Sequence, residues 1–256
     1  MGSTRMSKKR IVITGLGMVS PLGNTVTDNW NNLLAGVSGI GPITRFDASN
    51  LACQIAGEVK DFDITQYIPA KEARRMDVFI HYGIAAAFQA IEDAGLDNIE
   101  GLDKTRVGVN IGAGIGGLPS IEATGADVIA GGIRKINPFF IPGSLINLIA
   151  GHVTIMKGYQ GPSYGIVSAC TTGAHCIGDA ARMIAYGDAD IMIAGGAEGA
   201  ICTLGMGGFA AMKALSTRND EPQKASRPWD KERDGFVMGE GAGVMVLESY
   251  DSAVAR

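Results

Sequence analysis

Aromatic residues, cysteine, histidine and long apolar runs are all scarce in this 256-residue sequence. It contains no uninterrupted apolar stretch of about 18 residues, so a membrane span is not expected. Gly187, Asp188 and Asp190 interrupt the most apolar region. The formal net charge of −4 argues against a nucleic-acid footprint spread over the whole surface. A membrane protein and a DNA-binding protein are therefore both disfavoured.

The few cysteines point to a reducing environment. The chain contains Cys53, Cys170, Cys176 and Cys202, which show neither CxxC spacing nor the density of a disulfide scaffold. The N-terminal segment lacks the apolar region of a secretion signal. We therefore expect a cytoplasmic protein without a metal ion or cofactor. Residues 1–5 have the composition of an expression scar, and residues 6–256 are expected to form one domain.

Glycine, in contrast, is abundant, with 37 residues, and it borders several short β-branched runs. These runs predict strands at 10–14, 106–111, 164–168, 190–194 and 243–247. Between the first two, apolar residues recur at steps of three and four from Met76 to Ile91, which predicts an amphipathic helix ending before Gly95. Strands that alternate with helices indicate an α/β fold with a largely parallel sheet covered on both sides.

Cys170 lies in the most informative segment of the sequence. The pattern around it predicts a strand, a sharp turn and then a helix that runs to Tyr186, with Cys170 at the helix N-terminus. Unpaired N–H groups and the positive end of the helix dipole at such a position favour a thiolate. Gly173 allows close approach of backbone or substrate, and the small neighbours Ala169 and Thr171 leave the sulfur uncrowded. The other three cysteines are interpreted as inert core residues.

Several motifs in this order resemble the β-ketoacyl-ACP synthases, type II most closely. The resemblance runs from about Arg10 to the last residue. The motifs are Ser168-Ala-Cys-Thr-Thr-Gly, Ile184-Ala-Tyr-Gly-Asp-Ala-Asp, Ala194-Gly-Gly-Ala-Glu, Ala214-Leu-Ser-Thr-Arg-Asn-Asp, Arg227-Pro-Trp-Asp and Asp234-Gly-Phe-Val-Met-Gly-Glu-Gly-Ala-Gly.

The resemblance implies a thiolase-like layered αβαβα architecture, of which this chain supplies the N-terminal half. It also implies a condensing enzyme of fatty-acid elongation. Cys170 would accept an acyl group from acyl-ACP, and decarboxylation of malonyl-ACP would provide the carbanion that attacks it to give 3-oxoacyl-ACP. Two histidines and a lysine of the C-terminal half support the second step in this family. The chain stops at Arg256 without those motifs, so we expect it to be inactive alone in the complete reaction and expect even acylation to be impaired.

The three histidines of this chain are not expected to substitute for the missing ones. His81 lies in the amphipathic helix and His152 in an apolar helical run. His175 is displaced by about 140° around the helix from Cys170. All three are interpreted as structural residues.

A glycine-rich run and two phenylalanines are candidates for the acyl pocket. In family terms Ile115 matches the residue that gates the pocket, with Phe140 and Phe209 near its walls; from the sequence alone all three could equally be core residues. Gly112, Gly114 and Gly117 also satisfy GxGxxG. A dinucleotide-binding site would require an acidic residue at the end of the next strand, whereas Asp127 falls in an expected helix or loop.

Basic residues stand out against the acidic background and are candidates for docking of the acidic acyl carrier protein. They could equally be solvated helix and loop charges. These residues are Lys71, Arg74, Arg75, Arg134, Lys135 and Lys213. The resemblance further implies a homodimer formed through a strand of this half.

Two other functions remain open. A non-catalytic half or a partner subunit resembling a chain-length factor would share the motifs, although such factors generally lack the reactive cysteine. A degradative thiolase acting on coenzyme A would share the fold, but its motifs fit poorly between Arg227 and Gly243.

Overall fold

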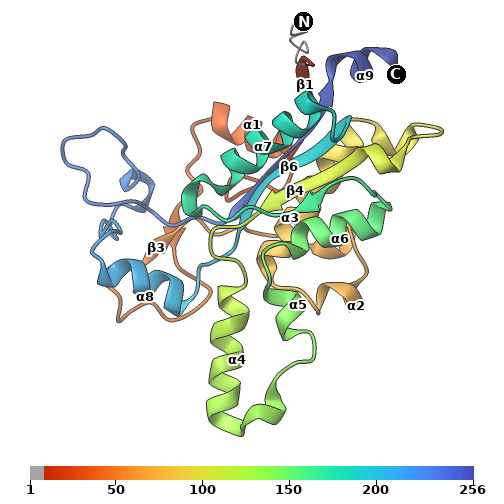
Figure 1. The fold of residues 1–256 in the computed structure, drawn as a ribbon. Coiled ribbons are helices and arrows are strands. Elements are labelled where there is room, and N and C mark those ends of the chain that lie inside the picture. Colours follow the sequence, from red (N-terminus) through yellow and green to blue (C-terminus); the bar gives the residue numbers. More distant parts are fainter. Residues whose placement is uncertain (1–8) are drawn as a thin grey trace, which may run out of the picture.

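The computed structural model describes residues 9–256, so the expected expression scar at 1–5 lies outside the described residues. A five-stranded sheet in the order β1-β7-β6-β4-β5 forms its centre (Figure 1). The strands of this sheet are β1 (Ile11–Val19), β4 (Val107–Gly112), β5 (Ser163–Tyr164), β6 (Ile191–Glu198) and β7 (Gly241–Ser249). A small separate sheet pairs β2 (Gly41–Pro42) with β3 (Ile55–Ala56).

The central sheet is mixed. β4 pairs in parallel with β5 and β6, whereas β7 is antiparallel to both β6 and β1. The expectation of a largely parallel sheet is therefore right for the direction of β1, β4, β5 and β6 and wrong for β7. Apolar runs buried on both faces look alike in either direction, so the sequence of β7 did not reveal its reversal.

Helices cover both faces of this sheet and extend beyond it. The α-helices are α1 (Val26–Leu34), α2 (Ala70–Ala73), α3 (Val78–Asp93), α4 (Leu118–Gly131), α5 (Phe140–Ser144), α6 (Leu148–Lys157), α7 (Thr172–Tyr186), α8 (Thr203–Ala211) and α9 (Tyr250–Ala255). Short 3-10 helices are η1 (Ile64–Gln66), η2 (Leu96–Asn98), η3 (Lys104–Arg106), η4 (Ile133–Lys135), η5 (Ala169–Thr171) and η6 (Pro222–Lys224).

The predicted amphipathic helix is α3, and its ends follow from local chemistry. The carboxylate of Asp77 accepts a hydrogen bond from the Phe79 N–H at 3.3 Å and so caps the first turn. Gly95, in the left-handed conformation with φ 67°, follows the last turn. Most of α3 is buried, because it packs across β1, β7 and β6 on one face of the sheet.

Alternating side chains of the central strands supply two separate cores. Ile191 and Ile193 of β6 lie in the core shared with α3 and α6, whereas Met192 and Ala194 lie in the core shared with α7. This two-residue period is that of a strand buried on both faces. α7 thus covers the face opposite α3 (Figure 1).

Two strands differ in length from the sequence prediction. β1 continues to Val19, five residues beyond the predicted end at Thr14, because Gly15 and Gly17 pack under α3 instead of forming a turn. β5 contains only Ser163 and Tyr164, so the predicted strand at 164–168 is wrong. The chain leaves the sheet there to build the turn at Cys170.

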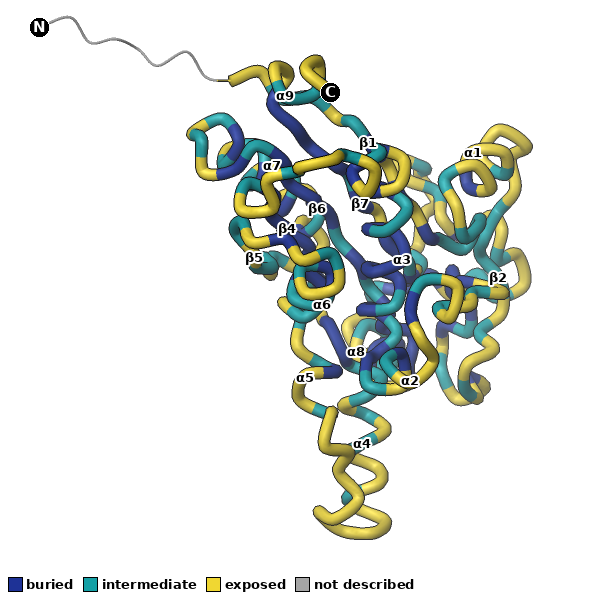
Figure 2. Tube along the Cα trace, turned by 90° about the vertical axis from the view of Figure 1, so that its right-hand side faces the viewer, coloured by how far each residue is buried: buried dark blue, intermediate teal, exposed yellow. Residues whose placement is uncertain are grey.

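A helical arm made of α4, η4 and α5 extends away from the sheet (Figure 1). The tube in Figure 2 is largely yellow along this arm, which means that its residues are exposed. Ile129, Ile133 and Ile141 are 90%, 77% and 60% exposed. Among residues 9–256, no helix combines the length and apolar character needed to cross a bilayer.

The contact between β1 and α3 can be tested with Gly17→Ala. A Cβ atom at Gly17 would lie 1.8 Å from the Ala86 carbonyl oxygen, so β1 and α3 would have to separate. We expect a loss of about 3 kcal/mol in the free energy of unfolding, measured by urea denaturation. Gly243→Ala is the control, because no atom lies within 4 Å of its added Cβ. Equal effects of the two substitutions would contradict the close contact.

Candidate active site

Cys170 lies on a sharp turn that joins β5 to α7. The turn is strained at Ala169, a non-glycine residue with φ 52°. The Ser168 N–H donates to the Thr172 hydroxyl at 2.9 Å, which holds the two ends of the turn together. Cys170 is exposed and lies in η5, which leads directly into α7. The predicted turn-then-helix setting of this thiol is confirmed.

Glycines allow this turn to lie against the ends of two strands. A Cβ at Gly196, near the end of β6, would lie 3.0 Å from the Gly173 Cα in α7. A Cβ at Gly112, the last residue of β4, would lie 2.1 Å from the Ile166 carbonyl oxygen. Any larger residue at these positions would push the Cys170 turn away from the sheet. The close backbone approach predicted for Gly173 is therefore present.

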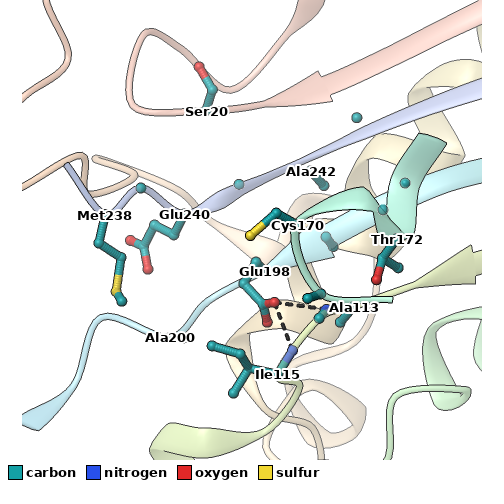
Figure 3. A pocket seen from close by; sticks show the side chains of 18 of the residues that line it. Ser20, Ala113, Ile115, Cys170, Thr172, Glu198, Ala200, Met238, Glu240 and Ala242 are labelled. Atoms are coloured by element: carbon teal, nitrogen blue, oxygen red, sulfur yellow. Dashed lines mark hydrogen bonds between the residues drawn. The ribbon is translucent and has the colours of Figure 1, made fainter. Parts of the chain in front are cut away.

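The Cys170 sulfur points into a cavity of 730 Å³ (Figure 3). Glycine, alanine and apolar side chains form most of its wall. Ile115 and Phe209, two of the predicted pocket residues, line the cavity. Phe140, the third, lies on the arm in α5 and is not among the described residues that line it. Its role in an acyl pocket stays a prediction.

Glu198 is a cavity residue that sequence reasoning did not single out. Its carboxylate accepts hydrogen bonds from the N–H groups of Gly114 and Ile115, both at 2.9 Å (Figure 3), and from the N–H group of Gly116 at 3.1 Å. Burial raises the pKa of this carboxyl group, and the three N–H donors oppose that rise. An acidic residue at the end of a buried strand, in Ala194-Gly-Gly-Ala-Glu, was the available signal.

The hydrogen bonds to Glu198 occupy the N–H groups of the GxGxxG run. The N–H groups of Gly114, Ile115 and Gly116, which a phosphate would need, already donate to a carboxylate. Asp127 lies within α4 and not at the end of a strand. The glycine run therefore serves a contact within the chain.

A second carboxylate, that of the buried Glu240, lies in the cavity wall formed by residues 236–243. It accepts hydrogen bonds from the Val59 N–H at 2.9 Å and the Tyr82 hydroxyl at 3.2 Å, and it forms an ion pair with Arg45. Burial raises the pKa of Glu240, and Arg45 opposes that rise. The network joins the segment just before β7 to α3 and to the loop that carries Arg45.

The three histidines lie away from the cavity wall, as far as residues 9–256 show. The His81 Nε2 lies 2.8 Å from the Ala73 carbonyl oxygen in the core, and burial lowers the pKa of His81 and of His152. The His175 Nδ1 lies 2.7 Å from the Ser168 hydroxyl.

The candidate docking residues fall into two regions. Arg75 stacks on Phe139 at 4.4 Å and pairs with Glu72, so Lys71, Arg74 and Arg75 lie beside the base of the arm. Arg134 and Lys135 lie on the arm in η4. Lys213 follows α8 and lines a separate hollow with Arg227, Lys231 and Arg233. Except for the half-buried Arg75, the six candidates are exposed.

The family model described as "Beta-ketoacyl synthase, N-terminal domain" matches residues 8–253. The chain belongs to the β-ketoacyl synthase family. It is 61% identical over 251 residues to "3-oxoacyl-[acyl-carrier-protein] synthase 2" of Vibrio harveyi, covering 98% of this chain and 60% of that protein. The chain thus spans about 60% of the length of that curated relative.

Solved structures agree with this assignment. A β-ketoacyl synthase from Burkholderia phymatum STM815 superposes with a TM-score of 0.87 at 33% identity, over 97% of this chain and 61% of that one. A ketosynthase described in complex with its type II polyketide acyl-carrier protein gives a TM-score of 0.80 at 32% identity, over 98% and 60%. The expected thiolase-like α/β fold is confirmed.

Reactivity should single out Cys170 among the four thiols of this ketoacyl synthase domain. Burial raises the pKa of Cys53 and Cys176 and raises that of Cys202 to about 11, so little thiolate forms at these sites near neutral pH. We expect iodoacetamide at pH 7.5 to label Cys170 at least about 100-fold faster, as followed by peptide mass spectrometry. Cys170→Ser should remove the fast phase. Equal rates for Cys170 and Cys202 would contradict this view.

The ion pair between the exposed Arg45 and the buried Glu240 carboxylate gives the ketoacyl synthase domain a specific pH response. Arg45→Ala leaves the Glu240 carboxylate without its cation, and we expect a loss of about 3 kcal/mol at pH 8. Without Arg45 the folded-state pKa of Glu240 rises further above its unfolded value. Stability is therefore lowest above that pKa and recovers as the pH falls through it.

Urea denaturation between pH 5 and 8 measures this difference between the wild type and Arg45→Ala. Adding Glu240→Gln to Arg45→Ala should remove the pH dependence of the difference, because no titratable group is then left at this position. A deficit that grows on acidification would show that another group is responsible.

Proposed function

We propose that this domain carries the acyl-accepting half of a 3-oxoacyl-ACP synthase that elongates fatty acids. The observation that supports it most directly is the exposed Cys170 on a strained turn, with its sulfur in an apolar cavity. The Cys170 thiolate attacks the thioester carbonyl of acyl-ACP. The carrier protein's sulfur leaves as a thiolate as its carbon–sulfur bond breaks and the new thioester forms on Cys170.

The cavity wall suits an acyl chain. Ile115 and Phe209 lie on elements that approach Cys170 from different directions, the loop after β4 and helix α8. An alkyl chain placed there loses contact with water at a gain of about 0.8 kcal/mol for each buried CH₂ group. The intact Cys170 also favours an enzyme over a subunit that resembles a chain-length factor.

The condensation step requires groups beyond those found here. In the family, two histidines and a lysine of the C-terminal half act on malonyl-ACP, and the N–H of the nucleophilic cysteine supplies only part of the oxyanion hole. His81, His152 and His175 lie outside the cavity wall, so they do not take over this step. We therefore propose acyl transfer for this domain and condensation for it together with a C-terminal half.

The proposed partners are acyl-ACP and malonyl-ACP. The exposed Lys71, Arg74, Arg134 and Lys135 near or on the arm would attract an acidic carrier protein. We further propose a homodimer, because β5 is an edge strand and the arm exposes isoleucines. Since the cysteines are unpaired, a reducing compartment such as the cytoplasm is part of the proposal.

The proposal is tested by incubating the chain with dodecanoyl-ACP and malonyl-ACP. We expect mass spectrometry of the digested chain to find a dodecanoyl group on the peptide that contains Cys170, and to find none in Cys170→Ala. We expect 3-oxoacyl-ACP only when a C-terminal half is supplied, for example from the Vibrio harveyi relative. Transfer to a different residue, or none to Cys170 even with that half present, would refute the proposal.

A further inference from the structure

Glu198 holds together two parts of the cavity that the chain makes far apart in sequence. It ends β6, whereas the N–H groups that it accepts belong to the loop after β4. β4 and β6 are parallel neighbours with Gly112 opposite Gly196, so both strands end at the same edge of the sheet. The Glu198 side chain bridges these two ends beside Cys170 (Figure 3).

Apart from Glu198, the bridged loop is held mainly by backbone contacts: the Gly117 N–H donates to the Ser144 carbonyl oxygen at 3.2 Å, and Gly116 packs on Ile146. Residues 112–117 contain four glycines, and Gly116 adopts φ 78°. Glycine backbones have the largest conformational freedom of any residue, so such a loop needs external contacts to stay in one conformation. Three consecutive N–H groups converge on one carboxylate. A carboxylate offers about four acceptor positions and no donor, which suits this arrangement of donors.

The loop in turn controls the space around the thiol. Ile115 projects from the middle of the bridged segment into the cavity (Figure 3). Gly114 packs on the Cys170 turn, since an added Cβ would lie 3.0 Å from the Ala169 carbonyl oxygen. A shift of the loop away from Glu198 would therefore move Ile115 and change the opening next to Cys170.

We propose that Glu198 is a positioning residue for acyl-chain selection. By holding the N–H groups of residues 114–116 it keeps Ile115 in the cavity and so limits the length of chain that can join Cys170. This inference rests on the proposed function, because it takes the cavity to be the acyl site. Glu198 acts through Ile115 and the loop and does not take part in bond formation.

Alkylating probes of two lengths test this without a carrier protein. Iodoacetamide and N-dodecyl iodoacetamide both form a carbon–sulfur bond to the Cys170 thiolate and release iodide. The quantity measured is the ratio of their Cys170 labelling rates, dodecyl over unsubstituted, in the 256-residue chain. For Glu198→Gln we expect this ratio to rise at least about fivefold, since the amide leaves an N–H group without an acceptor. An unchanged ratio in folded Glu198→Gln would overturn the proposal.

Two further variants separate positioning from a general loss of structure. Ile115→Ala should raise the ratio by itself, and Glu198→Gln should add nothing in that background if it acts through Ile115. Glu58→Gln is the matched control. Glu58 is a buried carboxylate that accepts the N–H groups of Thr44 and Arg45, and it is not part of the cavity wall. We expect it to leave the ratio unchanged; an equal rise in Glu58→Gln would overturn the proposal.

A measurement on the unmutated chain covers the case in which Glu198→Gln does not fold. A dodecyl group on Cys170 must displace Ile115, so hydrogen exchange of the amides at residues 114–116 should become faster than in the iodoacetamide-labelled chain. Equal exchange in the two would overturn the inference. If iodoacetamide did not label Cys170 at all, the proposed function itself would be refuted, and the role of Glu198 with it. Labelling with an unchanged ratio would remove only the role of Glu198.

Discussion

The site depends on close backbone contacts that only glycine residues can make, because they lack a Cβ atom. Gly112 ends β4, Gly196 lies near the end of β6, and Gly173 lies in the first turn of α7. Their Cα atoms pack so closely that a Cβ on Gly112 or Gly196 would meet backbone atoms at 3.0 Å or less. The start of α7 can therefore rest on the ends of two parallel strands. That position turns the Cys170 sulfur toward the cavity.

Two carboxylates, the half-buried Glu198 and the buried Glu240, lie in the cavity wall. Glu198 is satisfied by N–H groups alone, whereas Glu240 shares a cation, a hydroxyl and an N–H group. Burial raises the pKa of each carboxyl group, and each lies where two segments distant in sequence meet. Their bonds order loops that glycine would otherwise leave free. The thiol thus lies between two walls fixed by polar contacts inside an apolar cavity.

The local sequence pattern was sufficient to predict the elements with strong periodicity of apolar residues. The apolar spacing from Met76 to Ile91 and the left-handed Gly95 marked α3 almost to the residue. The same reasoning predicted a β1 strand that was too short, because Gly15 and Gly17 look like turn residues until the packing of α3 is known. It also predicted a β5 strand that was too long, because the apolar residues after Tyr164 belong to the Cys170 turn and not to the sheet.

The sequence by itself determined the family and the α/β class and predicted the turn-then-helix setting of Cys170. These follow from short local patterns or from the order of the motifs. Only the tertiary structure decided which residues share the cavity. It placed Ile115 and Phe209 in its wall, left Phe140 on the arm, and brought Glu198 to three N–H groups more than eighty residues earlier in the chain. Such contacts depend on strand order and direction. Neither property is encoded in the spacing of residues along any one segment.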